Sequence, residues 1–123
     1  MTPPQSQRLS IVPSEFTIGH VPDATFPEDD EWIALVRAPE GLTVVREAWG
    51  NDAGARWIGL YSAEAYGCGI PGMLAAVAGP LSAAGVPVFV ASTFHADLVL
   101  VPAERRADAL AALDTAGHKV LNP

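Results

Sequence analysis

The stretch WIGLYSAEAYGCGIPGMLAAVAGPLSAAG, residues 57–85, decides the fold of this chain. Its first four residues are typical of a strand, and a glycine-rich loop follows them. A helix is predicted to open at Pro71-Gly72-Met73, because proline is preset for the first helical turn, where its missing N–H costs nothing. Gly85 is expected to end this helix. Four residues at intervals of three and four lie on one predicted helical face: Leu74, Val77, Leu81 and Ala84.

The loop between the predicted strand and helix runs from Tyr61 to Ile70. A strand that leads through glycines into a helix N-terminus leaves a ring of backbone N–H groups without helical partners. Such a ring, at the positive end of the helix dipole, suits an anion or a carboxylate. Further along, Pro80 lies inside the predicted helix, where it is expected to remove one backbone hydrogen bond and bend the axis.

The rest of the second half alternates strand and helix signals. Strands are predicted at residues 88–93, 98–101 and 118–121, and a helix at about 103–116 with Gly117 as its cap. Together with residues 57–85, the order is β-α-β-β-α-β, which is that of a ferredoxin-like unit. The expected fold class is therefore α+β.

The first half carries strand signals and little helix. Residues 1–8 are predicted to form a loose tail. Residues 9–21 are rich in β-formers and interrupted by Pro13, which predicts one interrupted strand or two short ones. The runs 32–37 and 42–46 flank a Pro/Gly turn and predict a hairpin. The acidic segment 23–31 is expected to be a solvated connection.

Composition and charge exclude several classes of function. The chain has 123 residues, half of them hydrophobic, which suffices for one compact body. Its formal charge of −7 divides into −5 over residues 1–57 (4 basic, 9 acidic) and −2 over residues 58–123 (3 basic, 5 acidic). Because no basic cluster exists, we expect no nucleic-acid binding and no attraction to anionic membranes. A single cysteine, with no signal peptide and no long apolar run, predicts a cytoplasmic protein.

At the residue level the second half resembles the ACT domain family. The resemblance lies in residues 60–81 (LYSAEAYGCGIPGMLAAVAGPL), 84–94 (AGVPVFVASTF), 98–102 (LVLVP) and 116–118 (AGH). It is closest to the subgroup found in small bacterial proteins, in aspartokinases and in the CASTOR-type arginine sensors. It implies the ferredoxin-like βαββαβ ACT fold and two ACT-like halves, a degenerate one at 1–57 and a complete one at 58–123.

ACT domains usually bind amino acids or similar small molecules at domain interfaces. The resemblance therefore implies that backbone amides of the loop and helix start grip the carboxylate of a ligand. Asp97 and Glu64 are candidates for an ammonium or guanidinium group, although Asp97 is equally interpretable as a turn residue. Family members often carry Asp, Thr and an aromatic residue where this chain has His95, Ala96 and Leu98. The expected ligand-binding residues are Ser62, Glu64, Gly67, Gly69, Ile70, Pro71, Gly72 and Asp97.

Other interpretations of these residues are weaker. Residues 67–72 satisfy G-x-G-x-x-G, but the first glycine does not end a strand and no acidic residue closes the next strand, so a dinucleotide site is rejected. Cys68, His95 and Asp97 lack any spacing that supports a catalytic set, and a free cysteine is more often a packing residue. The histidines lack metal-ligand spacing. The three tryptophans are expected to fill the core or a subunit seam.

Two functions follow from these residues. The first is a regulatory ACT module without catalytic activity, cofactor or metal, which binds a small molecule. The resemblance implies that this molecule is an amino acid. The second is a structural or protein-interaction role in which the ligand site has been lost. A homodimer is expected in either case, because a ferredoxin-like sheet leaves edge strands that must be covered or paired.

Overall fold

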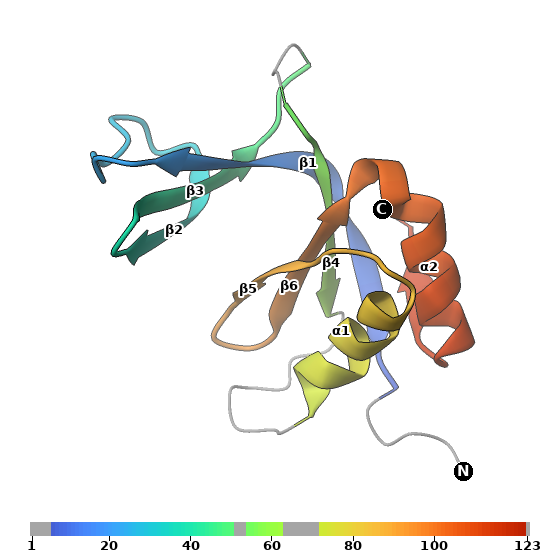
Figure 1. Ribbon diagram of the computed structural model, residues 1–123. Coiled ribbons are helices and arrows are strands. Elements are labelled where there is room, and N and C mark those ends of the chain that lie inside the picture. The colour runs from blue at the N-terminus through green and yellow to red at the C-terminus, as the bar shows by residue number, and fades with distance from the viewer. Residues whose placement is uncertain (1–5, 51–53, 63–71, 123) are drawn as a thin grey trace.

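The computed structural model describes residues 6–50, 54–62 and 72–122. Seven strands form one mostly antiparallel sheet, and two α-helices lie against it (Figure 1). The mixed α/β composition and the strand-dominated first half agree with the sequence. In chain order the elements are β1 (Arg8–Val21), β2 (Trp32–Ala38), β3 (Gly41–Glu47), β4 (Trp57–Ser62), α1 (Met73–Ala83), β5 (Phe89–Ser92), β6 (Asp97–Pro102), the 3₁₀ turn η1 (Ala103–Arg105), α2 (Arg106–Thr115) and β7 (Lys119–Leu121).

The long strand β1 connects the two halves of the chain. Its first part pairs with β4 on one side and with β7, in parallel, on the other. Its last part pairs with β3, which continues into the hairpin with β2. The predicted interruption at Pro13 is a register shift between Ile11 and Glu15 within one strand, because proline cannot donate to the ladder. Strand β1 therefore stands between β4 and β7 in the sheet.

The larger core lies between one face of the sheet and both helices. Leu81, Leu60 and Leu113 are fully buried there, and Leu9 of β1 joins them. The spacing of apolar residues in α1 explains this packing, since Val77 and Leu81 are buried while Ala84 is exposed at the helix end. The two halves of the chain thus share one hydrophobic core.

A smaller core lies on the opposite face of the sheet, where β1 bends toward the β2–β3 hairpin. Phe16, Val45 and Leu100 form its buried centre, and Trp57 and Phe89 pack against them. This cluster packs the β2–β3 hairpin against β5 and β6, which lie below the hairpin in Figure 1. The other two tryptophans are not core residues, because Trp32 is 38% exposed and Trp49 is 61% exposed.

Both helices end at the predicted glycines, each in a Schellman motif. After α1, Val86 N–H donates to Leu81 O (2.9 Å) and Gly85 N–H to Ser82 O (3.0 Å), with Gly85 at φ 73°. Gly117 closes α2 in the same way, at φ 93°. The start of α1 differs from the prediction. Gly72 precedes the helix in the left-handed conformation, φ 84°, instead of lying in its first turn.

The first half contains one clear correction. The hairpin of β2 and β3 was predicted, whereas residues 6–8 are not a loose tail. Gln7 is only 3% exposed, and Arg8 begins β1. Of the described residues, no helix is long and apolar enough to cross a membrane.

Gly59 provides a stability test of the close packing around β4. An added Cβ would lie 2.9 Å from the ring of Phe16 and 3.2 Å from Leu98, whereas one on Gly79 in α1 would meet nothing within 4 Å. Gly59→Ala should therefore destabilise the protein by about 1–3 kcal/mol. Gly79→Ala, the matched control in a helix, should stabilise it by about 1 kcal/mol. Urea unfolding of both variants measures the difference, and equal stability of Gly59→Ala and the parent would contradict this packing.

Candidate functional site

The sequence-predicted site residues divide into two groups in the structure. Ser62 ends β4 and Asp97 begins β6, and the pairing of Tyr61 with Leu98 places them next to each other at one end of the sheet. Gly72 lies at the start of α1. The remaining five, Glu64, Gly67, Gly69, Ile70 and Pro71, lie outside the described residues, as does Cys68.

Gln7 links the end of β4 to the start of α1. The Ser62 hydroxyl donates to Gln7 Oε1 (3.1 Å), and Gln7 Nε2 donates to the carbonyl oxygen of Met73 (2.7 Å). The amide of a single buried side chain therefore holds the residues on either side of segment 63–71. Sequence reasoning missed Gln7, because a polar residue near the beginning of a chain carries no signal of burial.

His118 completes the network from the other side. The backbone N–H of Gln7 donates to His118 Nδ1 (3.0 Å), so Nδ1 is the acceptor and the ring proton lies on Nε2. His118 Nε2 then donates to the carbonyl oxygen of Ala76 (2.7 Å). Lys119 N–H donates to the Gln7 carbonyl (2.9 Å), which ties this network to β7.

Pro80 explains why α1 needs the histidine. In a regular helix the carbonyl of residue 76 accepts from the N–H of residue 80, and proline has none. His118, 5% exposed, supplies the missing donor to Ala76. Because a buried unpaired carbonyl is costly, the predicted loss of one helical hydrogen bond is compensated from another element.

Comparison with known proteins identifies the fold family. Residues 53–115, just over half of the chain, match the family described as the ACT domain. The chain belongs to the ACT domain family. ACT domains are generally regulatory modules that bind small molecules. No curated protein matches the sequence.

Two solved structures share this ACT protein's architecture along nearly the whole chain. One is protein Atu0741 from Agobacterium tumefaciens, with a TM-score of 0.77 and 22% identity over 96% of this chain and 94% of that one. The other is VC0802 from Vibrio cholerae, described as a protein of unknown function and possible transport protein. Its TM-score is 0.72 with 27% identity over 89% of this chain and 88% of that one. The fold therefore extends beyond the matched ACT segment to the N-terminal strands.

Asp97 lies at the tip of the β5–β6 hairpin in this ACT fold. Ser92 Oγ donates to its Oδ1 (2.7 Å), and no described residue bonds its other oxygen. The adjoining turn satisfies itself, since Thr93 N–H donates to Ala96 O (2.7 Å) and Ala96 N–H to Thr93 Oγ1 (3.0 Å). The local bond to Ser92 fits the interpretation of Asp97 as a turn residue, and the free oxygen leaves an acceptor for a ligand cation.

Ser62 is placed differently from a simple ligand donor. It is 4% exposed, and its hydroxyl proton is directed to Gln7. Its hydroxyl group therefore ties the end of β4 to Gln7. Its contact with a ligand stays a prediction.

The N-terminus of α1 has no capping side chain among the described residues, and its first turn contains no acidic residue. Among the described residues, the positive end of the helix dipole therefore has no carboxylate in the first turn to neutralise it. Gly72 aims the chain into this turn, and its carbonyl accepts from Ala76 N–H (3.0 Å). This arrangement suits an anionic group, as the sequence suggested for the ACT loop.

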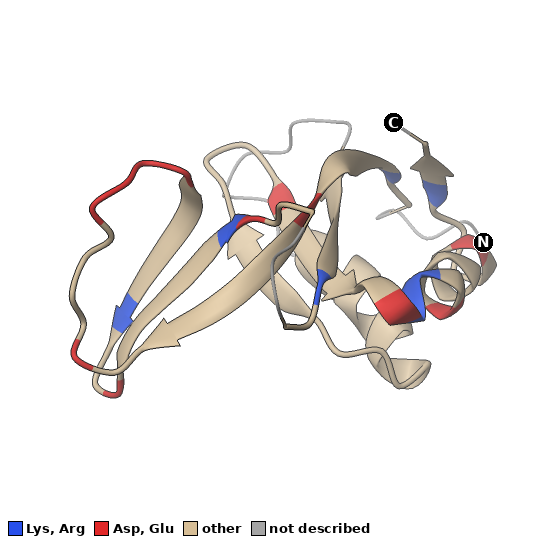
Figure 2. Ribbon diagram, turned by 90° about the horizontal axis from the view of Figure 1, so that it is seen from above, with Lys and Arg blue, Asp and Glu red and all other residues tan. Residues whose placement is uncertain are grey.

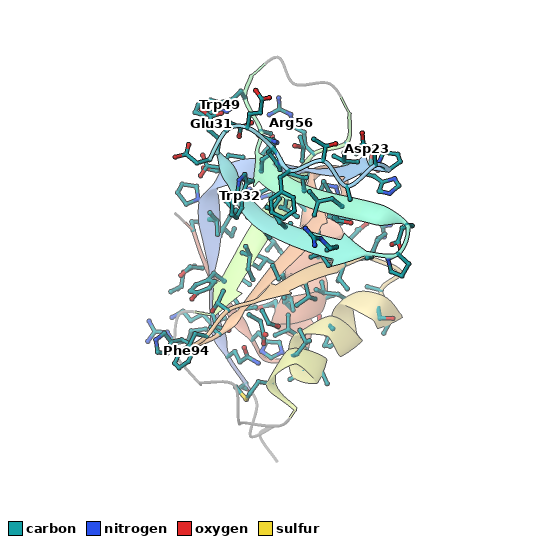
Figure 3. The ribbon with its side chains drawn as sticks, turned by 90° about the vertical axis from the view of Figure 1, so that its left-hand side faces the viewer. Asp23, Glu31, Trp32, Trp49, Arg56 and Phe94 are labelled. Atoms are coloured by element: carbon teal, nitrogen blue, oxygen red, sulfur yellow. The ribbon has the colours of Figure 1, made fainter. Side chains whose placement is uncertain are left out.

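The histidines of the described residues contact different parts of the fold. His95 stacks edge-on against Phe94, with ring centroids 4.9 Å apart, and Phe94 stands at the rim of the sheet (Figure 3). Within residues 6–50, 54–62 and 72–122, no group of three His, Cys, Asp or Glu residues could hold a metal ion. His20 hydrogen-bonds to the carbonyl of Glu40 (2.9 Å), far along the chain from His118.

The Gln7–Ser62 bond should contribute measurably to stability, because both partners are buried. Gln7→Ala and Ser62→Ala should each cost about 1–3 kcal/mol, since each leaves a buried polar atom unpaired. The double variant should cost less than the sum of the two, by about 0.5 kcal/mol or more. Urea unfolding supplies all four free energies. Ser92→Ala, which removes an exposed bond to Asp97, is the control and should change stability by no more than about 0.5 kcal/mol.

The dependence of His118 on Pro80 can be tested by a second cycle. His118→Phe removes the donor to Ala76, whereas Pro80→Ala restores an N–H at residue 80 that can take its place. His118→Phe should therefore destabilise the Pro80→Ala background by about 1 kcal/mol less than it destabilises the parent. Thermal and urea unfolding provide the measurement. Equal costs in the two backgrounds would show that Ala76 does not need the histidine.

Proposed function

We propose that this chain is a regulatory ACT module that binds a free amino acid between Ser62 and Asp97 at the end of the sheet and Gly72 at the start of α1. Two observations carry this proposal: the N-terminus of α1 has no capping side chain among the described residues, and the half-buried Asp97 carboxylate has an oxygen that no described residue bonds. The helix end supplies a positive dipole for the ligand carboxylate. The free oxygen of Asp97 supplies an acceptor for its ammonium group.

The remaining predicted contacts belong to the same proposal. Glu64, Gly67, Gly69, Ile70 and Pro71 complete the loop that grips the ligand, with Gly72 giving the close backbone approach. A carboxylate alone would bind weakly, because water competes well for it, so selectivity depends on the second anchor. A dianion is disfavoured by the charge of −7 on the chain.

We further propose that the protein is cytoplasmic and acts without catalysis. Residues 58–123 form the complete ACT unit, with the ferredoxin-like order β4-α1-β5-β6-α2-β7, and residues 1–57 form a degenerate ACT-like half. Output then passes through assembly or a separate partner. A homodimer is the assembly we favour, because β2 and β5 are edge strands and the β2 side chains of Ile33 and Val36 are 40% and 49% exposed. Light scattering that shows only a 12.8 kDa species at micromolar concentration would contradict the dimer.

The alternative is a protein-interaction role in which the ligand site has been lost. The exposed apolar residues of β2 and the exposed Phe94 and Trp49 favour it. Ligand-induced stabilisation that depends on Asp97 distinguishes the two functions, because a module that has lost the ACT-loop site gains nothing there from a free amino acid.

Gly72 and Asp97 provide the decisive variants. At least one amino acid in a complete panel should raise the melting temperature, and about 100-fold excess over its Kd should add about 2.7 kcal/mol. Asp97→Ala should erase most of this shift and leave the unliganded melting temperature nearly unchanged. Gly72→Val should abolish the shift and also destabilise the protein by about 1 kcal/mol or more, because φ is 84° there.

Gly85→Val is the matched control for Gly72→Val. Gly85 has a similar φ of 73°, and an added Cβ there meets nothing within 4 Å. It should show the same kind of destabilisation and retain the full ligand response. If no amino acid shifts melting of the parent at millimolar concentration, the interaction role replaces the sensor role.

A further inference from the structure

A pocket lies under the connection between β1 and β2, and none of its lining residues belongs to β4, α1 or β6. Its volume is about 250 Å³, just below the range of about 300 Å³ and above that is typical of ligand sites. Strands β1 and β3 form its floor, and the connection of residues 22–31 forms its outer wall. The lining residues are Thr17, Gly19, His20, Val21, Thr25, Pro27, Asp29, Val44 and Arg46. This floor is the face of β1 and β3 that turns away from Phe16 and Val45 of the smaller core.

Gly19 keeps the floor of this pocket open. It pairs with Val44 in the middle of the β1–β3 ladder, and its backbone does not require glycine, because its φ is not in the left-handed region. An added Cβ would meet only the Val44 carbonyl, at 3.9 Å. Glycine within a strand weakens the strand and often marks a close approach by a ligand or another backbone. Here the described chain does not fill the space that the missing side chain leaves.

Opposite charges lie side by side in the pocket. Arg46 Nη1 donates to Asp29 Oδ1 (2.8 Å), with side chains 32% and 47% exposed. Asp29 Oδ1 also accepts from Glu31 N–H (3.0 Å). The bond from Arg46 and the N–H of Glu31 lower the pKa of Asp29, so this carboxylate is ionised at neutral pH. The described residues use one nitrogen of the guanidinium and one oxygen of the carboxylate, which leaves the other donors and the second oxygen available.

The other lining residues define the rest of the chemistry of the pocket. Val21, Val44 and Pro27 are apolar, while Thr17 and Thr25 add hydroxyl groups. The connection that closes the pocket is held in place, since Trp32 Nε1 donates to the Asp29 carbonyl (3.1 Å) and Asp23 Oδ1 accepts from Thr25 N–H (3.0 Å). Asp23 and Glu31 mark its two ends in Figure 3, and Figure 2 shows the run of acidic residues along it.

We propose that this pocket binds a small zwitterion whose carboxylate and ammonium groups are adjacent and whose apolar part is short. The carboxylate pairs with the unused guanidinium nitrogens of Arg46, and the ammonium pairs with the second oxygen of Asp29. An anion without an ammonium group would be repelled by the acidic connection with nothing to offset the repulsion. An amine without a carboxylate would likewise be repelled by Arg46. The short apolar part rests on Gly19 against Val21 and Val44.

This site is independent of the proposed ACT-loop site, because the two share no residue. A titration of the full chain with L-valine, followed by ¹H–¹⁵N NMR, separates them. The amides of Gly19 and Thr25 and the Arg46 side chain should shift with a single Kd. Isovalerate, which lacks the ammonium group, and isobutylamine, which lacks the carboxylate, should bind at least about tenfold more weakly at the same resonances.

Two variants with matched controls test the contacts. Gly19→Val fills the floor with a good strand former and should remove the shifts while the rest of the spectrum stays native. Arg46→Gln should weaken valine binding by about tenfold or more. Arg56→Gln is its control, since Arg56 forms a comparable exposed ion pair with Glu15 (3.2 Å) outside the pocket and should bind valine like the parent. Asp97→Ala should also leave these shifts intact.

Four results would overturn the proposal. One is the absence of shifts at Gly19, Thr25 and Arg46 at about 20 mM valine, a concentration that detects even the weak binding of so small a molecule. Another is an unchanged Kd in Gly19→Val or in Arg46→Gln. The third is equal binding of isovalerate or isobutylamine. Loss of the valine shifts in Asp97→Ala alone would assign them to the ACT-loop site instead.

Discussion

The pairing of β1 with both β4 and β7 is the constraint on which the rest of the structure depends. Strand β1 supplies Leu9 and Ile11 to the core beneath the helices and Phe16 to the core beneath the hairpin. Its register with β4 also places Leu9 opposite Ser62, and therefore sets Gln7 just beyond the end of β4. If β1 shifted by one residue, every side chain on it would change faces, and both cores would lose their contacts together.

The buried network around Gln7 shows how polar groups can be placed next to an apolar core. Every hydrogen-bonding group of this set has a partner: the amide of Gln7, the hydroxyl of Ser62 and both ring nitrogens of His118. Since a partly satisfied buried network would destabilise the fold, these side chains specify one arrangement of β4, α1 and β7. The two charge pairs at the hairpin side are of another kind. Their side chains are 26–47% exposed, and Arg56 also bonds the backbone oxygen of Trp49, so these pairs orient loops more than they stabilise the fold.

Sequence reasoning succeeded where the signals are local. The strand and helix of residues 57–85, the hairpin around residues 38–41 and the glycine caps at Gly85 and Gly117 depend on neighbouring residues, and the structure contains all of them. The family match confirms the ACT resemblance. The sequence could not reveal the burial of Gln7 or the task of His118, because both depend on a contact between residues 111 positions apart. For the site, strand order alone brings Ser62 and Asp97 to one end of the sheet. The hydrogen bond from the Ser62 hydroxyl to Gln7 could not be predicted from the sequence.

The parallel pairing of β1 with β7 has a consequence for how the chain acquires its structure during synthesis. Arg8 emerges from the ribosome more than a hundred residues before its strand partner Lys119. Until then Leu9 of β1 lacks a neighbour on one side, and Gln7 lacks the histidine that accepts its N–H. Such long-range contacts are slow to form, because the entropy of closing the chain must be overcome before they provide any stabilisation. The nascent chain therefore exposes an unpaired edge of β1 until residues 119–121 have been synthesised. The larger core and the network around Gln7 are completed only when the three residues of β7 have been added.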